Sequence, residues 1–151
     1  MFDLGGHVID PMVRLMGRPR KVTSVLQKES SLADKLNDNT LAMLEWDRAM
    51  ATVHSSSLQP DSNRHRAFEV FGTEGSAILS PIEPPVLELD LAKAAGPYGS
   101  GRQTVPLPPY KRFIGDFEDL AGAVRGEHGL KVPLEQDFVV LETLLRCSGM
   151  A

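Results

Sequence analysis

Residues 66–79 read Arg-Ala-Phe-Glu-Val-Phe-Gly-Thr-Glu-Gly-Ser-Ala-Ile-Leu, which is two β-prone runs on either side of the turn sequence Gly72-Thr73-Glu74-Gly75. Aromatic and branched apolar residues favour strands, and glycine at both ends of a short polar segment favours a reversal of the chain. The segment therefore predicts a β-hairpin. A phosphate-binding loop is the other interpretation of residues 72–75, but no helix follows, so the amide groups that would cradle a phosphate are missing.

Further strand signals fill the middle of the chain. Residues 21–29 form one run, and residues 40–46 and 49–58, separated by Asp47-Arg48, predict a second hairpin. Two shorter runs, 86–91 and 103–107, lie in a stretch rich in proline and glycine. Apolar residues occupy both phases of the 40–46 run, which indicates that both faces of the sheet are partly covered.

Helical patterns are confined to the two ends of the chain. Residues 3–16 carry an apolar stripe that stops at Gly17 and Pro19. Pro11 leaves two alternatives: Asp10 caps a short helix with Pro11 at its first position, or the helix begins near Asp3 and bends at Pro11. Two more helices are predicted at 112–124 and from Pro133 onward. The last of them is expected to bury a side made of Phe138, Leu141, Leu144 and Leu145.

The order helix, antiparallel strands, two helices predicts an α+β fold, with helices packed on one face of a largely antiparallel open β-sheet. The apolar residues of the opposite phase then need another cover, and a second copy of the chain is the simplest one. We expect this second set to include Ala42, Leu44 and Trp46. The sequence therefore predicts a homo-oligomer, a dimer or a tetramer, formed through the free face of the sheet.

Composition excludes several classes of function. The chain of 151 residues has the size of one domain, and its formal charge of −4 offers no attraction to nucleic acid or anionic lipid. No apolar run is long enough to span a bilayer, and the N-terminus lacks the pattern of a secretory signal. The single cysteine, Cys147, excludes an internal disulfide and a multi-cysteine zinc site. We expect a soluble cytoplasmic protein that binds neither nucleic acid nor membranes, and no metal site.

Asp3 and His7 are the candidate catalytic residues, because they share one face if the segment is helical. A carboxylate can fix the tautomer of an imidazole, which itself titrates near neutral pH and can move a proton. A surface ion pair or a cap is the plainer interpretation of such a pair. Gly5 and Gly6 favour function, since a glycine inside a helix costs about 1 kcal/mol and usually marks a close approach of backbone or ligand. Asp10 can fix the imidazole or cap the turn, and capping is favoured.

Four ordered segments of the chain resemble one known family. They are Phe2–Asp10 with Leu15–Pro19 and Val22, the hairpin Phe68–Ser76, the segment Phe113–Phe117, and the closing segment Leu141–Met150. The order is similar to the C-terminal domain of the glucose-fructose oxidoreductase, inositol dehydrogenase and MocA-type (Gfo/Idh/MocA) family, over the whole chain. The resemblance implies an enzyme in which a Rossmann domain holds NAD or NADP and a C-terminal α+β domain supplies the substrate site and the oligomer interface.

By this resemblance, residues 1–151 are the C-terminal substrate-binding and oligomerisation domain of an NAD(P)-dependent oxidoreductase that acts on a sugar or polyol hydroxyl or carbonyl. Asp3 would orient the substrate, and His7 would be the acid-base group, together with a lysine of the Rossmann domain. No G-x-G-x-x-G follows a strand in this sequence, and the family's Glu-Lys-Pro segment is missing as well. We therefore expect that the Rossmann domain is absent, as in a truncated gene product, an expressed domain or half of a split enzyme. The isolated chain is predicted to bind no cofactor and to be inactive. The alternative is a non-catalytic oligomerisation or ligand-sensing module derived from the same family.

Overall fold

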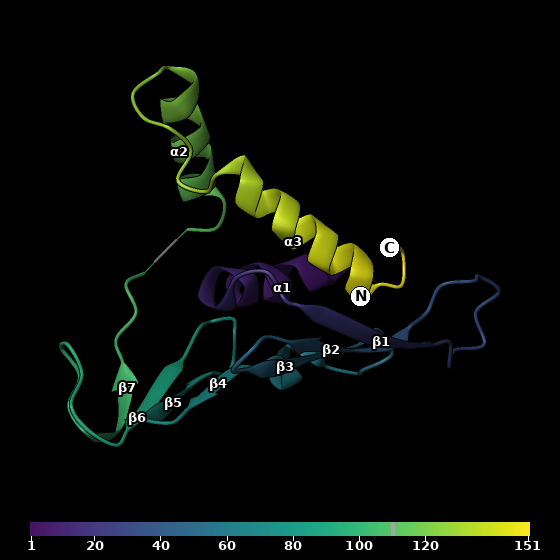
Figure 1. The fold of residues 1–151 in the computed structure, drawn as a ribbon, viewed down its shortest axis with the longest axis horizontal. Coiled ribbons are helices and arrows are strands. Elements are labelled where there is room, and N and C mark those ends of the chain that lie inside the picture. The colour runs from purple at the N-terminus through teal and green to yellow at the C-terminus, as the bar shows by residue number, and fades with distance from the viewer. Residues whose placement is uncertain (110) are drawn as a thin grey trace. The chain divides into compact units, whose positions relative to one another are not determined.

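A computed structural model describes the backbone of residues 1–109 and 111–151, with the side chains of all of these except Asp3 and Leu4. The chain divides into two compact units, one made of Met1–Gln59 with Ile114–Ala151 and the other of Pro60–Phe113 (Figure 1). They are called the first unit and the second unit below. None of the helices in the described part of the chain is long and apolar enough to cross a membrane.

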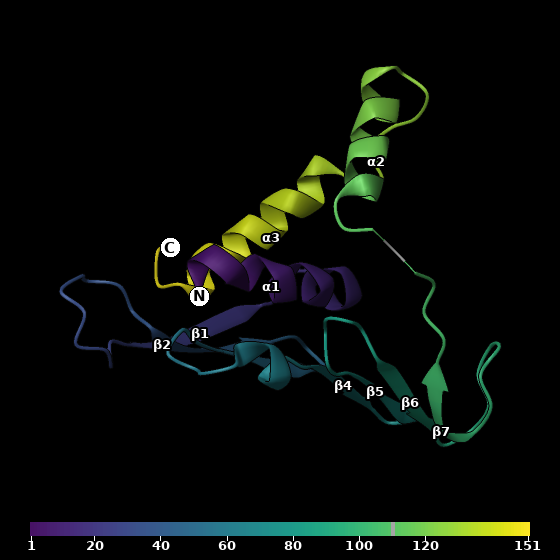
Figure 2. The ribbon, with the colours of Figure 1, turned by 180° about the vertical axis from the view of Figure 1, so that it is seen from behind.

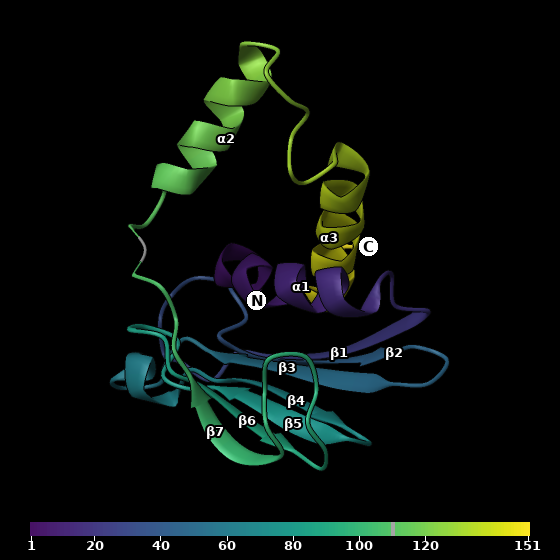
Figure 3. The same cartoon turned by 90° about the vertical axis from the view of Figure 1, so that its left-hand side faces the viewer.

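The first unit consists of a three-stranded antiparallel sheet and three helices. The strands β1 (Lys21–Gln27), β2 (Asn39–Glu45) and β3 (Met50–Ser56) are adjacent in that order, and β2 and β3 form the hairpin that the sequence predicts. The helices are α1 (Phe2–Met16), α2 (Ile114–Val124) and α3 (Leu134–Cys147). Figures 1 and 3 show that α1 and α3 lie together on one face of this sheet.

The second unit is an antiparallel meander. Its strands β4 (Phe68–Gly72), β5 (Gly75–Leu79), β6 (Leu87–Leu91) and β7 (Gly101–Val105) pair in chain order, after a short 3-10 helix at Ser62–His65. Gly72 and Gly75 form the last pair of β4 and β5, which confirms a hairpin turn at residues 72–75. The α+β class is confirmed, and the strands form two antiparallel sheets instead of the single open sheet expected.

Helix α1 runs without interruption through Pro11, so Asp10 does not cap a shorter helix. Because proline has no N–H, the helical hydrogen bond from residue 11 to the carbonyl of His7 is missing. The helix ends at Gly17, which has φ +75°, a conformation that suits glycine. The indole Nε1 of Trp46 donates a hydrogen bond of 3.0 Å to the Gly17 carbonyl and so ties the end of α1 to the sheet.

The buried phase of β2 is the opposite of the one expected. Ala42 and Leu44 are fully buried, whereas Leu41 and Met43 are exposed. Thr40 has the same phase and pairs with Leu26 of β1, so the side chains of Thr40 and Leu26 lie on one face of the sheet. On that face, the side chain of Leu26 lies against the backbone just after α3. Ala42 and Leu44 therefore face the helices, and the prediction that they lie on the outer face was wrong. Trp46, expected beside them, is half-buried and bonded to α1.

Helix α3 has two apolar sides, of which only one is buried. Leu144 and Cys147 are buried, and α3 packs against α1 and β1. Phe138 and Leu141, predicted to be on the buried side, are exposed. Burial raises the pKa of the Cys147 thiol to about 11, so this cysteine is an unreactive core residue.

Candidate functional site

Helix α1 turns one side to the core of the first unit and the other to solvent. Ile9, Met12 and Val13 are buried, and His7 is exposed on the opposite side of the helix. Asp3 belongs to the same helix one turn earlier, and its side chain lies outside the described residues. The structure thus leaves the His7 side chain exposed, and the pairing of His7 with Asp3 stays a prediction.

Helix packing explains the first of the two glycines before His7, Gly5. A Cβ atom at Gly5 would lie 3.2 Å from Cδ1 of Leu144 and 3.1 Å from the sulfur of Met1. A Cβ atom at Gly6 would lie 4.0 Å from the other methyl group of Leu144. Figures 1 and 2 show the start of α1 beside the C-terminal part of α3. The sequence predicts a close approach at these glycines. At Gly5 that approach is to α3, whereas at Gly6 the distance is that of an ordinary contact.

Asp10 is bonded to Arg14 and does not cap a helix, and no hydrogen bond joins it to His7 among the described residues. The Nε atom of Arg14 donates to both carboxylate oxygens of Asp10, at 2.9 and 3.0 Å. This bond raises the pKa of the Arg14 guanidinium, which stays charged in any case. This pair was not among the predictions from the sequence, although an acid followed four residues later by a base is the spacing that helical ion pairs use. The exposed side of α1 therefore carries an ordered ion pair one turn beyond His7.

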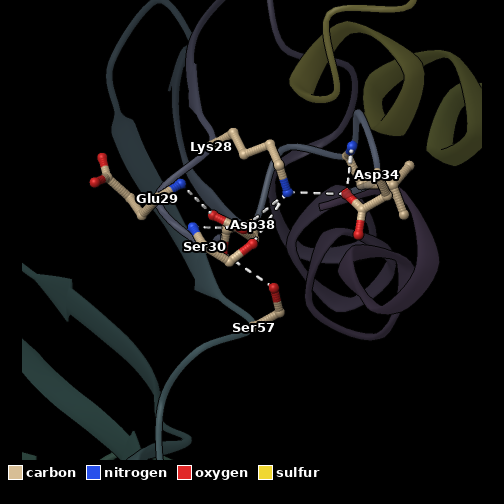
Figure 4. Close-up of polar contacts among 7 residues, drawn as sticks. Lys28, Glu29, Ser30, Asp34, Asp38 and Ser57 are labelled. Carbon is tan, nitrogen blue, oxygen red and sulfur yellow. Dashed lines mark hydrogen bonds and ion pairs between the residues drawn. The ribbon is translucent and has the colours of Figure 1, made fainter. Parts of the chain in front are cut away.

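A second polar cluster surrounds Asp38 in the connection between β1 and β2 (Figure 4). The Asp38 carboxylate accepts hydrogen bonds from the backbone N–H of Glu29 at 2.7 Å and of Ser30 at 3.1 Å. The Nζ atom of Lys28 lies 3.8 Å from the same carboxylate, and the hydroxyl of Ser57 donates to the Asp38 carbonyl at 3.1 Å. The backbone bonds lower the pKa of Asp38 to about 2, so its carboxylate is ionised at any physiological pH. The groups bonded to Asp38 belong to the same loop or to the residue just after β3, so these contacts hold the loop in one conformation.

The described residues do not fit a dinucleotide or metal site. A Rossmann site needs parallel strands joined by a helix whose N-terminus faces the pyrophosphate, and every strand pairing among the described residues is antiparallel. No group of three or more His, Cys, Asp or Glu side chains in the described part of the chain is arranged to hold a metal ion. The chemistry that the site offers is therefore that of one exposed imidazole on a rigid helix.

A family comparison identifies the chain. Residues 1–78, just over half of the sequence, match the GFO/IDH/MocA C-terminal domain. The chain belongs to this family. The matched part contains α1, the entire three-stranded sheet, β4 and all of β5 except its last residue. A comparison with curated proteins gives no match.

Solved structures share the fold over nearly the whole chain. UDP-N-acetylglucosamine 3-dehydrogenase GnnA from Acidithiobacillus ferrooxidans is 18% identical with a TM-score of 0.75, and the match covers 99% of this chain and 46% of that one. Levoglucosan dehydrogenase in complex with NADH and levoglucosan is 20% identical with a TM-score of 0.74, covering 99% and 47%. The WlbA dehydrogenase from Bordetella pertussis with NADH and UDP-GlcNAcA is 14% identical with a TM-score of 0.68, covering 97% and 40%. The chain thus spans about half the length of these structures or less, and at these identities the similarity establishes the fold.

Proposed function

We propose that this chain is the C-terminal substrate-binding and oligomerisation domain of an NAD(P)-dependent oxidoreductase that acts on a sugar or polyol hydroxyl or carbonyl, and that it is inactive without a Rossmann domain. The observation that carries the proposal is the exposed position of His7 on α1, in a chain that belongs to the GFO/IDH/MocA C-terminal domain family. Solved structures with the same fold include dehydrogenases bound to NADH and a sugar or nucleotide sugar.

The roles of the residues follow from the chemistry of alcohol oxidation. His7 takes the proton of the substrate hydroxyl during oxidation and returns it during reduction, because an imidazole has a pKa near neutral and works in both directions. In this proposal Asp3 orients the substrate. Buried Ile9 fixes the helix two residues away, so the imidazole is presented from a rigid element. When bound to its own domain, the nicotinamide cofactor supplies the hydride chemistry.

The proposal also includes assembly through the open face of the three-stranded sheet. Val25 and Leu41 are directly paired on that face, where Met43 and Met50 are exposed as well. Exposed apolar side chains on adjacent strands of one face are typical of an interface, and a second copy of the chain is the proposed partner. A cytoplasmic location completes the proposal, and the free buried thiol of Cys147 supports it.

The test is a turnover assay with NAD or NADP and a panel of sugars and polyols. The 151-residue chain should show no turnover. The chain joined to, or mixed with, the Rossmann domain that this proposal requires should be active, and His7→Ala should lower its turnover by about 10²- to 10⁴-fold. His65→Asn is the matched control, because His65 is an exposed histidine of the second unit.

Three results would contradict the proposal. Turnover by the isolated chain would show that no second domain is needed. Full activity of the His7→Ala variant in the extended enzyme would remove His7 from the chemistry. A folded extended chain that binds a sugar without turning it over would favour the non-catalytic sensing module.

A further inference from the structure

The open face of the three-stranded sheet is built from rows of side chains that cross all three strands. One row contains Val25 of β1, Leu41 of β2 and His54 of β3, because Leu41 pairs with Val25 on one side and with His54 on the other. Val25 and Leu41 are 54% and 42% exposed, and His54 is exposed as well. A histidine therefore continues the apolar row that the proposed assembly would cover.

The imidazole of His54 is held in one tautomer by a residue of the neighbouring row. Its Nε2 atom lies 3.0 Å from the side-chain amide oxygen of Asn39. Because an amide oxygen can only accept a hydrogen bond, Nε2 is the donor, and the neutral ring then has an unprotonated Nδ1. Protonation of His54 therefore adds a charge at Nδ1 and leaves the bond to Asn39 in place.

The other charged side chains on this face neutralise each other. They are Lys21 of β1 and Glu45 of β2, which are directly paired and whose Nζ and Oε1 atoms lie 3.2 Å apart. Glu45 is four residues from Leu41 along β2, which is about 13 Å in a strand, so it does not compensate a charge at His54. The remaining residues of β3 on this face, all described by the structure, are uncharged: Met50, Thr52 and Ser56. The helices α1 and α3 lie on the other face of the sheet.

The net charge of the open face depends on His54 alone, because Lys21 and Glu45 cancel. In a two-fold interface the same patch meets itself, so a face without net charge can meet its own copy without repulsion. This supports a second copy of the chain as the partner while His54 is neutral. When His54 is protonated, each side of the interface carries an uncompensated positive charge that must lose its water, and both effects cost free energy. Histidine is the side chain that changes its charge between about pH 5 and pH 8.

We propose that protonation of His54 controls assembly through the open sheet face, so that the oligomer forms at about pH 8 and dissociates at about pH 5.5. This inference rests on the assembly part of the proposed function and adds its regulation. The free chain binds a proton at His54 more readily than the oligomer does, so a decrease in pH shifts the equilibrium toward the free chain. A two-fold dimer contains two copies of His54, and its dissociation constant therefore increases by at most about a hundredfold per pH unit.

The test is sedimentation equilibrium of the 151-residue chain at a series of pH values from about 8 to about 5.5. The dissociation constant should increase by about tenfold or more over this range. His54→Gln should keep the dissociation constant that the unmodified chain has at high pH, because the glutamine amide can donate to Asn39 but does not titrate. His54→Arg carries a permanent charge and should associate weakly at every pH. His65→Asn is the matched control, since it removes an exposed histidine of the second unit, and it should keep the pH dependence.

Four results would overturn control by His54. A dissociation constant that does not change with pH, or the same pH dependence in His54→Gln as in the unmodified chain, would contradict this control and leave the assembly itself intact. Dissociation that occurs only together with unfolding, as followed by the fluorescence of Trp46, would assign the pH effect to the fold. A chain that stays monomeric at every pH, or an oligomer that Leu41→Ser does not weaken, would contradict the open face as the interface. Sedimentation does not depend on turnover, so the proposed reaction is tested separately by the assay of the His7→Ala variant.

Discussion

Replacing Leu44 by alanine should destabilise the first unit by about 3–4 kcal/mol, whereas replacing its neighbour Met43 should cost about 1 kcal/mol or less. Leu44 is fully buried, and the substitution removes three carbon groups that contribute about 0.8 kcal/mol each when buried. The cavity that remains between the sheet and the helices adds to this cost. Met43 is 39% exposed on the opposite face, so its replacement removes less buried apolar surface and lowers the free energy of unfolding by less. The comparison tests which face of β2 the helices cover.

Trp46 makes the measurement selective, because it is the only tryptophan of the chain and belongs to the first unit. Thermal unfolding followed by tryptophan fluorescence should show a decrease in Tm of at least about 10 °C for Leu44→Ala. The experiment is run at low protein concentration, so that a partner on the open face does not add to the cost at Met43. Equal destabilisation by the two substitutions, or a smaller effect at Leu44 than at Met43, would refute the assignment of the buried face.

Three further predictions concern other parts of the chain. Asp38 has a pKa of about 2 against a usual 3.8, so its contribution to stability is complete above about pH 5 and is lost as the pH falls through 3.8 toward 2. Asp38→Asn should therefore lower the Tm at pH 6. The Tm of this variant should also decrease less between pH 6 and pH 3 than that of the unmodified chain, as measured by tryptophan fluorescence. Gly75→Ala should destabilise the second unit by about 1–3 kcal/mol, because the new Cβ would overlap the Asp90 carbonyl oxygen. Calorimetry should detect this loss of stability, whereas the unfolding transition followed by tryptophan fluorescence should stay unchanged. Pro11→Ala should stabilise the first unit by up to about 3 kcal/mol in urea titrations, since it restores the missing helical bond, and a loss of stability would contradict this account of α1.

The elements that sequence analysis predicted well are those with explicit chemical signals at their ends. Gly17 and Pro19 mark the end of α1, Gly72 and Gly75 mark the hairpin of the second unit, and the closing helix begins next to Pro133. Each of these residues restricts the backbone directly, so the signal does not depend on tertiary contacts. The exposure of His7 also agrees with the period of α1, whose apolar residues occupy the other side.

The features that sequence analysis missed depend on contacts between distant parts of the chain. Both phases of β2 are apolar, so the pattern could not show that α1 and α3 cover Ala42 and Leu44 and leave Leu41 exposed. Phe138 lies on a second apolar side of α3 that a single helical stripe does not reveal. Asp38 stood in a polar loop without periodicity, and its role appears only when the loop closes on its backbone N–H groups.

The first unit is discontinuous along the chain, and this has a consequence for the order of folding during synthesis. Its last helix, α3, packs against α1 and β1, which leave the ribosome more than a hundred residues earlier. The second unit lies between these segments and is a meander in which each strand pairs with the next along the chain. Its contacts are local, and local contacts form quickly. The inserted meander can therefore be folded before α3 has been synthesised. Helix α1, which bears His7, is packed only after α3 has been made.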